Sequence, residues 1–377
     1  MKTLRVAVIG CGHLGRIHAK LLGGVEGAQL VAVADPLAES RRLAAAQSGA
    51  AELADYRDLI GRVDAAIVAA PATLHHAIGM ELLRHGIHVL MEKPLAVTAG
   101  EAEELVWAAN WHGAVLQVGH IEQFNPALAQ VLPLVQDPRL IEATRAGGYT
   151  FRSTDIGVVL DLMIHDLDIA LSLVRSPVRR VSAVGLSVMG QHEDVAQARI
   201  EFANGCVAQL SASRVSYRAR REMQIWSPHA QVEIDFATRR TTAVEPVDTL
   251  VDFDFNERDL SAEQKQHLQK HLFAELLPAR EQEAPAQNAL VEEQCDFIES
   301  IRTGRAPRVG GEQGRAVVAA AEQVLASIAE HRWDNFSMPT IGPLRIFAAP
   351  EPNILRGPHW DRPPHDQPAP LRRKEAG

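Results

Sequence analysis

The chain has 377 residues and a formal net charge of −9 at pH 7. At about 150 residues per domain, this length indicates about two domains. A hydrophobic fraction of 46% excludes disorder as a description of the whole chain, and three cysteines exclude a scaffold held by disulfides. The negative charge argues against nucleic acid as the main partner, and no apolar run approaches the ~20 residues that span a bilayer. We therefore expect a cytoplasmic protein with free thiols, no nucleic-acid partner and no membrane span.

The first 120 residues alternate between short apolar runs and longer segments with helical periodicity. The apolar runs, which we predict to be strands, are Leu4–Ile9, Leu30–Ala34, Ala65–Ala69, His88–Met91 and Ala114–Val118. Runs of this kind are typical of strands that are buried on both faces. Strands that alternate with helices indicate βαβ units. We therefore predict an α/β domain with a parallel sheet over residues 1–120.

The sequence pattern changes after residue 145. Segments 195–202 and 206–213 flank Asn204-Gly205, a dipeptide that indicates a β-hairpin because both residues tolerate positive φ. The other predicted elements are strands at Val178–Met189, Glu222–Trp226 and Gln231–Phe236, and helices at Ser261–Leu277, Leu290–Arg302 and Glu312–His331. We predict an α+β domain with an antiparallel sheet over residues 121–335. Its helices near 290–331 are expected to pack back on the first domain, and a proline-rich tail follows over 336–377.

A glycine-rich turn follows the first predicted strand. Residues 10–15 have the pattern G-x-G-x-x-G at the point where a strand ends and a helix begins. Such a turn lets the backbone approach a pyrophosphate, which the N–H groups of the helix N-terminus then bind. Asp35 ends the second strand, where a carboxylate accepts hydrogen bonds from an adenosine ribose and repels a 2′-phosphate. We therefore predict NAD as the cofactor and consider NADP less favoured, although Arg41 and Arg42 nearby weaken that preference.

The cofactor contacts that we predict here are Gly10, Gly12, His13, Leu14, Gly15 and Asp35. The alternative is a structural turn without a nucleotide, in which Asp35 caps a helix.

Two further segments close predicted strands and therefore share the rim of the sheet with the glycine turn. Pro71–His75 follows one strand and Glu92-Lys93-Pro94 closes the next. Ligands of open α/β sheets bind beyond the carboxyl ends of the strands, so Lys93 could orient a nicotinamide ribose or stabilise an alkoxide. The alternative is a surface ion pair of Lys93 with Glu92 or with another neighbour. The cofactor contacts that we predict at this rim are Pro71, Thr73, His75, Glu92, Lys93 and His120.

A strongly apolar segment at 157–168 carries titratable residues. Asp161, His165 and Asp168 are spaced i, i+4 and i+7, so an α-helix places them on one face. A buried charge is costly unless it is paired, and a carboxylate one turn from an imidazole can orient it and raise its basicity. We predict that His165 is a general base oriented by Asp161 and that Lys93 stabilises the alkoxide. Lys93 and His165 could exchange these roles, and the alternative is a core histidine with capping aspartates.

Together these residues resemble the glucose–fructose oxidoreductase/inositol dehydrogenase family. The resemblance covers about residues 4–330 and is carried by the turn at 10–15, Asp35, Pro71–His75, Glu92-Lys93-Pro94 and Asp161-x-x-x-His165. It implies a Rossmann domain followed by an α+β domain with an open, mainly antiparallel sheet. It also implies hydride transfer between a nicotinamide cofactor and a hydroxyl carbon of a sugar, cyclitol or nucleotide sugar. A homodimer or homotetramer is implied as well, and an exposed apolar sheet face would favour one.

A narrower resemblance, to bacterial UDP-N-acetylglucosamine 3-dehydrogenases, is carried by Val118–Pro126, Asp155–Asp168 and Cys206–Ser216. It implies oxidation of C3 to a 3-keto nucleotide sugar on the way to lipid A, with an aminotransferase as the downstream partner. The subgroup pattern has Arg where this chain has Gln123. The substrate contacts that we predict are Lys93, Phe124, Asn125, Arg152, Asp161, His165 and Arg214.

A nucleotide-sugar diphosphate needs cations. The candidates are Arg152, which precedes the Asp161 segment, and four arginines that follow the Asn-Gly hairpin at 214, 218, 220 and 221. We expect most of these four to be solvated charge at a strand end. The open alternatives are a dehydrogenase of a free sugar or inositol and a non-catalytic NAD-binding regulator on the same fold. We predict no metal site, because His267 and His271 lack a third ligand at a recognised spacing.

Overall fold

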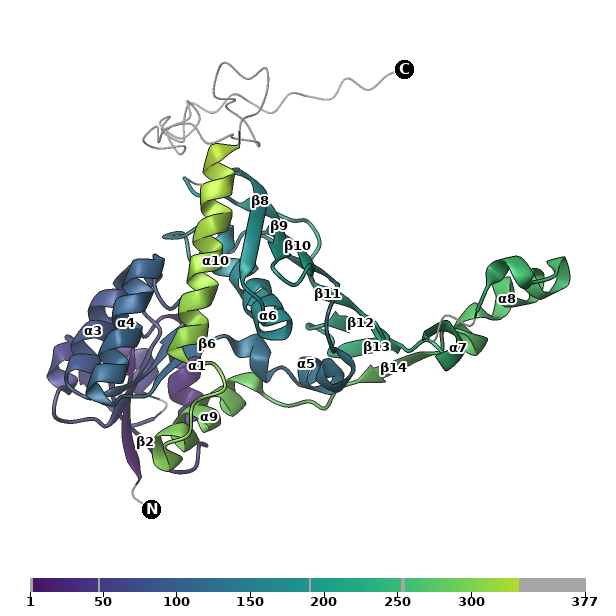
Figure 1. Cartoon of the computed structure of the whole chain (residues 1–377). Helices are drawn as coiled ribbons and strands as arrows, with labels where there is room; N and C mark the ends of the chain where they lie inside the picture. The colour runs from purple at the N-terminus through teal and green to yellow at the C-terminus, as the bar shows by residue number, and fades with distance from the viewer. Residues whose placement is uncertain (1–2, 47, 190, 252–254, 332–377) are drawn as a thin grey trace, which may run out of the picture.

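The computed structural model describes residues 3–46, 48–189, 191–251 and 255–331. The predicted tail at 336–377 lies outside these residues. Two sheets make up the described part, and helix α10 (Gly311–Glu330) runs between them (Figure 1).

The first sheet has six parallel strands in the order β3-β2-β1-β4-β5-β6. They are β1 (Leu4–Ile9), β2 (Ala28–Ala34), β3 (Ala51–Leu53), β4 (Ala65–Val68), β5 (His88–Glu92) and β6 (Leu116–Gly119). The connecting helices are α1 (His13–Leu22), α2 (Ala38–Ala45), η1 (Tyr56–Leu59), η2 (Ala72–Leu74), α3 (His75–Arg84) and α4 (Ala99–His112). The strand order reverses between β1 and β4, which is where ligands bind in such sheets. The predicted parallel sheet is confirmed, and the short strand β3 is an addition to it.

Burial on both faces explains the apolar runs of the first sheet. Along β1, Val6 and Val8 enter one hydrophobic cluster while Ala7 and Ile9 enter the cluster on the other face. No position on such a strand is left for a polar side chain, so the runs lack alternation.

Two glycines of the turn at 10–15 are required by their surroundings. Gly10 has φ +85°, and a Cβ there would lie 2.6 Å from the backbone of Ala69. A Cβ on Gly15 would lie 1.7 Å from the carbonyl oxygen of Gly10. The absence of both side chains lets α1 start directly against the end of β1.

The second sheet has eight strands in the order β14-β13-β12-β11-β7-β10-β9-β8. They are β7 (Leu140–Ala146), β8 (Val178–Leu186), β9 (Val195–Phe202), β10 (Val207–Ser213), β11 (Arg220–Ser227), β12 (Ala230–Asp235), β13 (Arg240–Val244) and β14 (Ala279–Glu283). All neighbours are antiparallel except β7 and β10. The mainly antiparallel sheet is confirmed. The predicted β-hairpin is confirmed as well: it joins β9 to β10, and Gly205 in its turn has φ +89°. Strands β7, β13 and β14 were not predicted.

Helices cover one face of the second sheet and join it to the first. They are η3 (Ile121–Phe124), α5 (Pro126–Val131), η4 (Leu132–Leu134), the π-helical turn η5 (Val159–Met163), α6 (Ile164–Val174) and α9 (Ala289–Thr303). Helix α10 contacts α4 and β6 on one side and α6 and β8 on the other, and α9 contacts α1. The domain boundaries at residues 120 and 335 stay predictions.

An arm extends from the edge of the second sheet through β13 and β14 (Figure 1). It carries α7 (Asp248–Val251), η6 (Glu257–Asp259) and α8 (Ala262–Glu275). Ser261 caps α8 through a capping box, and none of the residues of this helix is buried.

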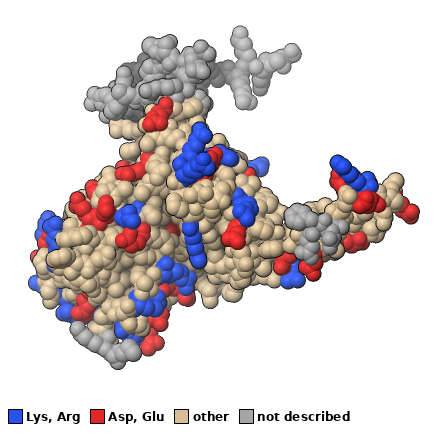
Figure 2. All heavy atoms as spheres, in the orientation of Figure 1, with Lys and Arg blue, Asp and Glu red and all other residues tan. Residues whose placement is uncertain are grey.

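The uncovered face of the second sheet carries both polar and apolar rows, and Leu140, Val207 and Trp226 form an aligned apolar row on it. A row of aligned side chains on it is formed by Glu142, Gln209, Gln224 and Glu233, and Gln224 donates to Glu233 at 3.0 Å. The face is therefore of mixed character, and the expected oligomer interface on it stays a prediction. Figure 2 shows acidic and basic side chains interspersed on the face drawn. No helix in the described part of the chain is long and apolar enough to cross a bilayer.

We predict that Gly15→Ala weakens NAD binding by about tenfold or more, because the new methyl group must push α1 away from Gly10. Gly100→Ala is the matched control, since a Cβ at that position in α4 meets nothing within 4 Å. The control should bind NAD normally and unfold at the same or a higher temperature. Equal NAD affinity of the two variants, measured by calorimetry, would contradict the role of Gly15.

Candidate active site

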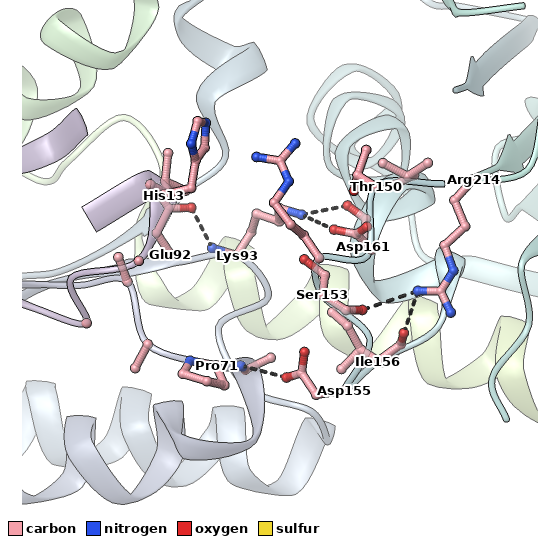
Figure 3. Close-up of a pocket in the computed structure, with 18 of the residues that line it drawn as sticks. His13, Pro71, Glu92, Lys93, Thr150, Ser153, Asp155, Ile156, Asp161 and Arg214 are labelled. Atoms are coloured by element: carbon pink, nitrogen blue, oxygen red, sulfur yellow. Dashed lines mark hydrogen bonds and ion pairs between the residues drawn. The ribbon is translucent and has the colours of Figure 1, made fainter. Parts of the chain in front are cut away.

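The carboxyl ends of the first-sheet strands open into a cavity of about 670 Å³, whose opposite wall belongs to the second sheet and its helices (Figure 3). The predicted cofactor residues that line it are Gly10, Gly12, His13, Leu14, Asp35, Pro71, Glu92 and Lys93. The predicted substrate residues that line it are Lys93, Arg152, Asp161 and Arg214. One cavity therefore joins the glycine turn to residues more than 140 positions away in the chain.

Asp35 is fixed beside the glycine turn by main-chain donors. Its Oδ2 accepts the N–H of Cys11 at 2.7 Å, and its Oδ1 accepts the N–H of Leu37 at 2.8 Å. The side chain lies at the end of β2 and lines the cavity. This is the position in which a carboxylate can bind the ribose of a dinucleotide.

Lys93 forms an ion pair across the two domains. Its Nζ lies 2.9 Å from Oδ1 of Asp161 and donates to the Asp161 carbonyl oxygen at 2.6 Å (Figure 3). The two side chains are only 16% and 17% exposed, so water screens the pair weakly. The alternative of a Lys93–Glu92 ion pair is wrong, because the Glu92 carboxylate accepts the main-chain N–H of Lys93 instead, at 3.3 Å.

The expectation that Asp161 orients His165 is also wrong. Asp161 lies in the π-helical turn η5, which precedes α6. A π-helical turn contains an extra residue, so positions 161 and 165 do not stack as they would in an α-helix. The Asp161 carboxylate therefore turns toward Lys93.

His165 is 9% exposed and does not line the cavity itself. Burial, together with the positive charges of Lys93 and Arg145, lowers the pKa of His165 well below its usual value. Its Nδ1 is buried and has no hydrogen-bond partner in the described part of the chain. The imidazole is therefore neutral at pH 7. No described group accepts a hydrogen bond from Nδ1, so none stabilises the imidazolium cation there.

His120 packs edge-on against His165, with the ring centroids 6.3 Å apart. It is buried, neither ring nitrogen has a partner among the described residues, and burial lowers its pKa. It does not line the cavity, so the predicted cofactor contact of His120 is not found.

Four more predicted contacts point into the protein or away from the cavity. Both ring nitrogens of His75 lie against carbonyl oxygens, of Pro94 at 2.7 Å and of Ala70 at 2.9 Å, so this residue ties two strand-end loops together. Thr73 is exposed outside the cavity. The other two are Phe124, buried beneath the guanidinium of Arg308, and Asn125, which caps α5. Gly15 does not line the cavity either, and its contribution is the close packing described above.

Arg214 reaches the cavity, but its charge is already paired. Its Nε lies 2.6 Å from Oδ1 of Asp194, and the Arg214 side chain is 7% exposed. Its Nη1 donates to the carbonyl oxygens of Ser153 at 3.2 Å and Ile156 at 2.8 Å (Figure 3). Arg214 therefore holds the cavity loop in place, with Asp194 as a partner that the sequence analysis missed.

Gln123, the departure from the subgroup pattern, lies outside the cavity lining. Its Nε2 donates to Oδ2 of Asp168 at 2.7 Å and to Oγ of Ser172 at 3.1 Å. Gln313 donates to the other oxygen of Asp168. Gln123 therefore helps to hold the buried carboxylate of α6 instead of facing the ligand.

Glu92 belongs to a buried cluster with His18 and Glu293, which the sequence analysis missed. Nε2 of His18 lies 2.7 Å from Glu92 Oε1. Glu293 is fully buried, and its two oxygens have no hydrogen-bond partner in the described structure. Donor atoms of the three residues lie within 4.8 Å of one another. Burial and the adjacent Glu92 raise the pKa of Glu293 well above its usual value, so the protonated, neutral form of Glu293 is favoured.

We predict that Glu293→Gln changes how stability depends on pH. The unfolded chain ionises Glu293 above a pH of about 4.3, whereas the folded chain keeps it protonated, so wild-type stability falls by up to about 1.4 kcal/mol per pH unit above that point until the folded pKa is reached. The variant lacks this loss. The free energy of unfolding of Glu293→Gln, minus that of the wild type, should therefore rise between pH 5 and 7.

The control is Glu292→Gln, an exposed neighbour on α9. Its difference from the wild type should stay constant over the same range, and a constant difference for Glu293→Gln as well would contradict the neutral buried acid.

Two family models match this chain. An NAD-binding Rossmann-fold model of the GFO/IDH/MocA oxidoreductase family matches residues 4–120, and the GFO/IDH/MocA C-terminal domain model matches residues 134–233.

Named relatives include several sugar and inositol dehydrogenases. UDP-N-acetylglucosamine 3-dehydrogenase from Acidithiobacillus ferrooxidans is 36% identical over 63% of this chain and 75% of its own. Its crystal structure has a TM-score of 0.75, with 31% identity over 87% of this chain and 98% of the other. The scyllo-inositol 2-dehydrogenase (NAD⁺) of Bacillus subtilis is 31% identical over 56% of this chain and 68% of its own. A levoglucosan dehydrogenase complex with NADH and L-sorbose shares the fold, with a TM-score of 0.73 and 19% identity over 88% and 98% of the two chains.

Proposed function

Because the chain belongs to the GFO/IDH/MocA family and is an NAD-binding oxidoreductase, we propose that it oxidises a secondary hydroxyl of a nucleotide sugar, namely C3 of UDP-N-acetylglucosamine. The observation that carries the proposal is the Lys93–Asp161 ion pair in the cavity. It lies where the cofactor half of the cavity meets the half built by the second domain. The substrate is taken from the A. ferrooxidans relative, which is similar over almost the full length of its structure.

The residues around the glycine turn fit a dinucleotide. The close approach of α1 to β1 places the N-terminus of this helix at the cavity, beside Gly12, His13 and Leu14, and a helix N-terminus in this position can bind a pyrophosphate. In the proposal, residues 10–14 bind the pyrophosphate and Asp35 binds the adenosine ribose. Bound NAD supplies the carbon that accepts a hydride.

Lys93 and His165 divide the proton chemistry in this proposal. Lys93 donates a hydrogen bond from Nζ to the substrate hydroxyl and stabilises the negative charge that develops on that oxygen. Asp161 holds Nζ in place. His165 lies behind the cavity wall formed by Asp161 and Leu162, and in the proposal it accepts the hydroxyl proton at Nε2. Its lowered pKa keeps the ring neutral before the reaction but also makes it a weaker proton acceptor.

Two alternatives remain distinct proposals. Dehydrogenation of a free sugar or inositol is supported by the B. subtilis relative, and it keeps the same residues in the same roles. A non-catalytic NAD-binding regulator does not need the Lys93–Asp161 ion pair in its cavity, so the presence of this pair argues against the regulator alternative.

We also propose a homo-oligomer, a cytoplasmic location and a downstream aminotransferase that consumes the 3-keto sugar. The oligomer rests on the family resemblance, and the part-exposed apolar row of Leu140, Val207 and Trp226 on the uncovered sheet face is compatible with it.

The proposal is tested by the absorbance of reduced nicotinamide, with NAD and each of UDP-N-acetylglucosamine, N-acetylglucosamine and inositol. An aminotransferase and glutamate remove the keto product. We expect a sustained rise with the nucleotide sugar alone. A rise with a free sugar or inositol in its place would support the first alternative, and no rise in a sample that binds NAD would favour the regulator.

Lys93→Met and His165→Ala are the control variants for this assay. Each should lower turnover by about 10²-fold or more while NAD affinity stays near the wild-type value. Near-normal turnover of either variant would contradict the role given to that residue.

A further inference from the structure

Most charged side chains that line the cavity have an ion-pair or hydrogen-bond partner, and two arginines do not. Lys93 is paired with Asp161, Arg145 with Glu122 and Asp166, and Arg214 with Asp194. The other lining carboxylates have partners too: Asp35 and Asp155 accept main-chain N–H groups, and Glu92 contacts His18. In the described part of the chain, no hydrogen bond or ion pair involves the guanidinium of Arg152 or of Arg221, although both residues line the cavity. Among the described residues, the second-domain wall therefore presents two guanidinium groups that no hydrogen bond or ion pair occupies.

Arg221 occupies a costly position for a cation. In the register of β11 and β7 it lies directly opposite Arg145, and like charges placed opposite each other destabilise a sheet. Arg145 contacts two carboxylates, at 2.7 and 2.8 Å, and neither of them contacts Arg221. The charge of Arg221 helps to lower the pKa of His165, so its guanidinium lies within electrostatic reach of the proposed base.

Arg152 is carried by a loop with an unusual backbone. Its neighbours Phe151 and Ser153 have φ values of +56° and +49°, a region that residues other than glycine rarely adopt. Arg214 fixes this loop through the carbonyl oxygens of Ser153 and Ile156 (Figure 3). A buried ion pair thus supports the strained loop on which an exposed arginine faces the cavity.

We propose that Arg152 and Arg221 form the subsite for the diphosphate of the substrate. This inference rests on the proposed function, since it assigns the sugar end to Lys93 and the charged linker to the arginines. A guanidinium donates charge-assisted hydrogen bonds to phosphate oxygens in a fixed planar geometry. The cofactor's own pyrophosphate has its place at the glycine turn on the other wall. A free sugar or inositol carries no group that would compensate the two charges.

The test measures UDP binding by calorimetry with NAD at saturation, so that the cofactor half of the cavity is already filled. Arg152→Gln and Arg221→Gln should each weaken UDP binding by about tenfold or more, and they should raise the KM for UDP-N-acetylglucosamine more than they lower kcat. The affinity for NAD should stay at the wild-type value and the unfolding temperature should not fall, which excludes misfolding as the cause; for Arg221→Gln the unfolding temperature should rise slightly, because a like-charge pair is removed.

Arg220→Gln is the matched control. It neighbours Arg221 on β11 but points to the other face of the strand and lies outside the cavity lining. It should bind UDP as the wild type does.

The outcomes separate this inference from the proposed function. If UDP binding depends on Arg152 and Arg221 but no NADH forms, the result would support the diphosphate subsite and contradict the proposed oxidation of UDP-N-acetylglucosamine. Turnover of UDP-N-acetylglucosamine that is indifferent to both arginines would overturn the subsite and leave the reaction standing. Failure of the wild type to bind UDP would overturn the subsite.

Discussion

The site depends on one ion pair, between Lys93 at the end of β5 and Asp161 in the π-helical turn of the second domain. The two residues are 68 positions apart in the chain, and each lies beside a different hydrophobic cluster. Their contact, together with the hydrogen bond from the Ala72 main chain to Asp155, fixes how the two walls of the cavity face each other. Because both charged groups are largely shielded from water, the loss of either one would leave the other poorly compensated.

The features that the sequence predicted are those with local causes. The glycine turn, Asp35 and Lys93 all come directly after apolar runs, and the ends of parallel strands meet at one rim. The Asn204-Gly205 hairpin and the capped helix at 261–277 likewise follow from the backbone preferences of a few neighbouring residues. Such signals survive in a single sequence because no distant partner is needed to interpret them.

The errors concern features that distant partners decide. Arg214 was expected to face a ligand, but Asp194, directly before β9 and 20 positions earlier in the chain, pairs with it. Strand β7 was missed because Arg145 breaks its apolar alternation, and only the burial of Glu122 and Asp166 makes that inward-facing arginine tolerable. A π-helical turn changes which side chains share a face, so the spacing of Asp161 and His165 was misleading.

The central claim is that a hydride leaves C3 of a nucleotide sugar at the Lys93 end of the cavity. UDP-N-acetylglucosamine with deuterium at C3 tests it, with mass spectrometry of the reduced cofactor as the measurement. The account predicts that each NADH formed carries one deuterium. NADH formed without deuterium would show that the hydride comes from another carbon and would contradict the account.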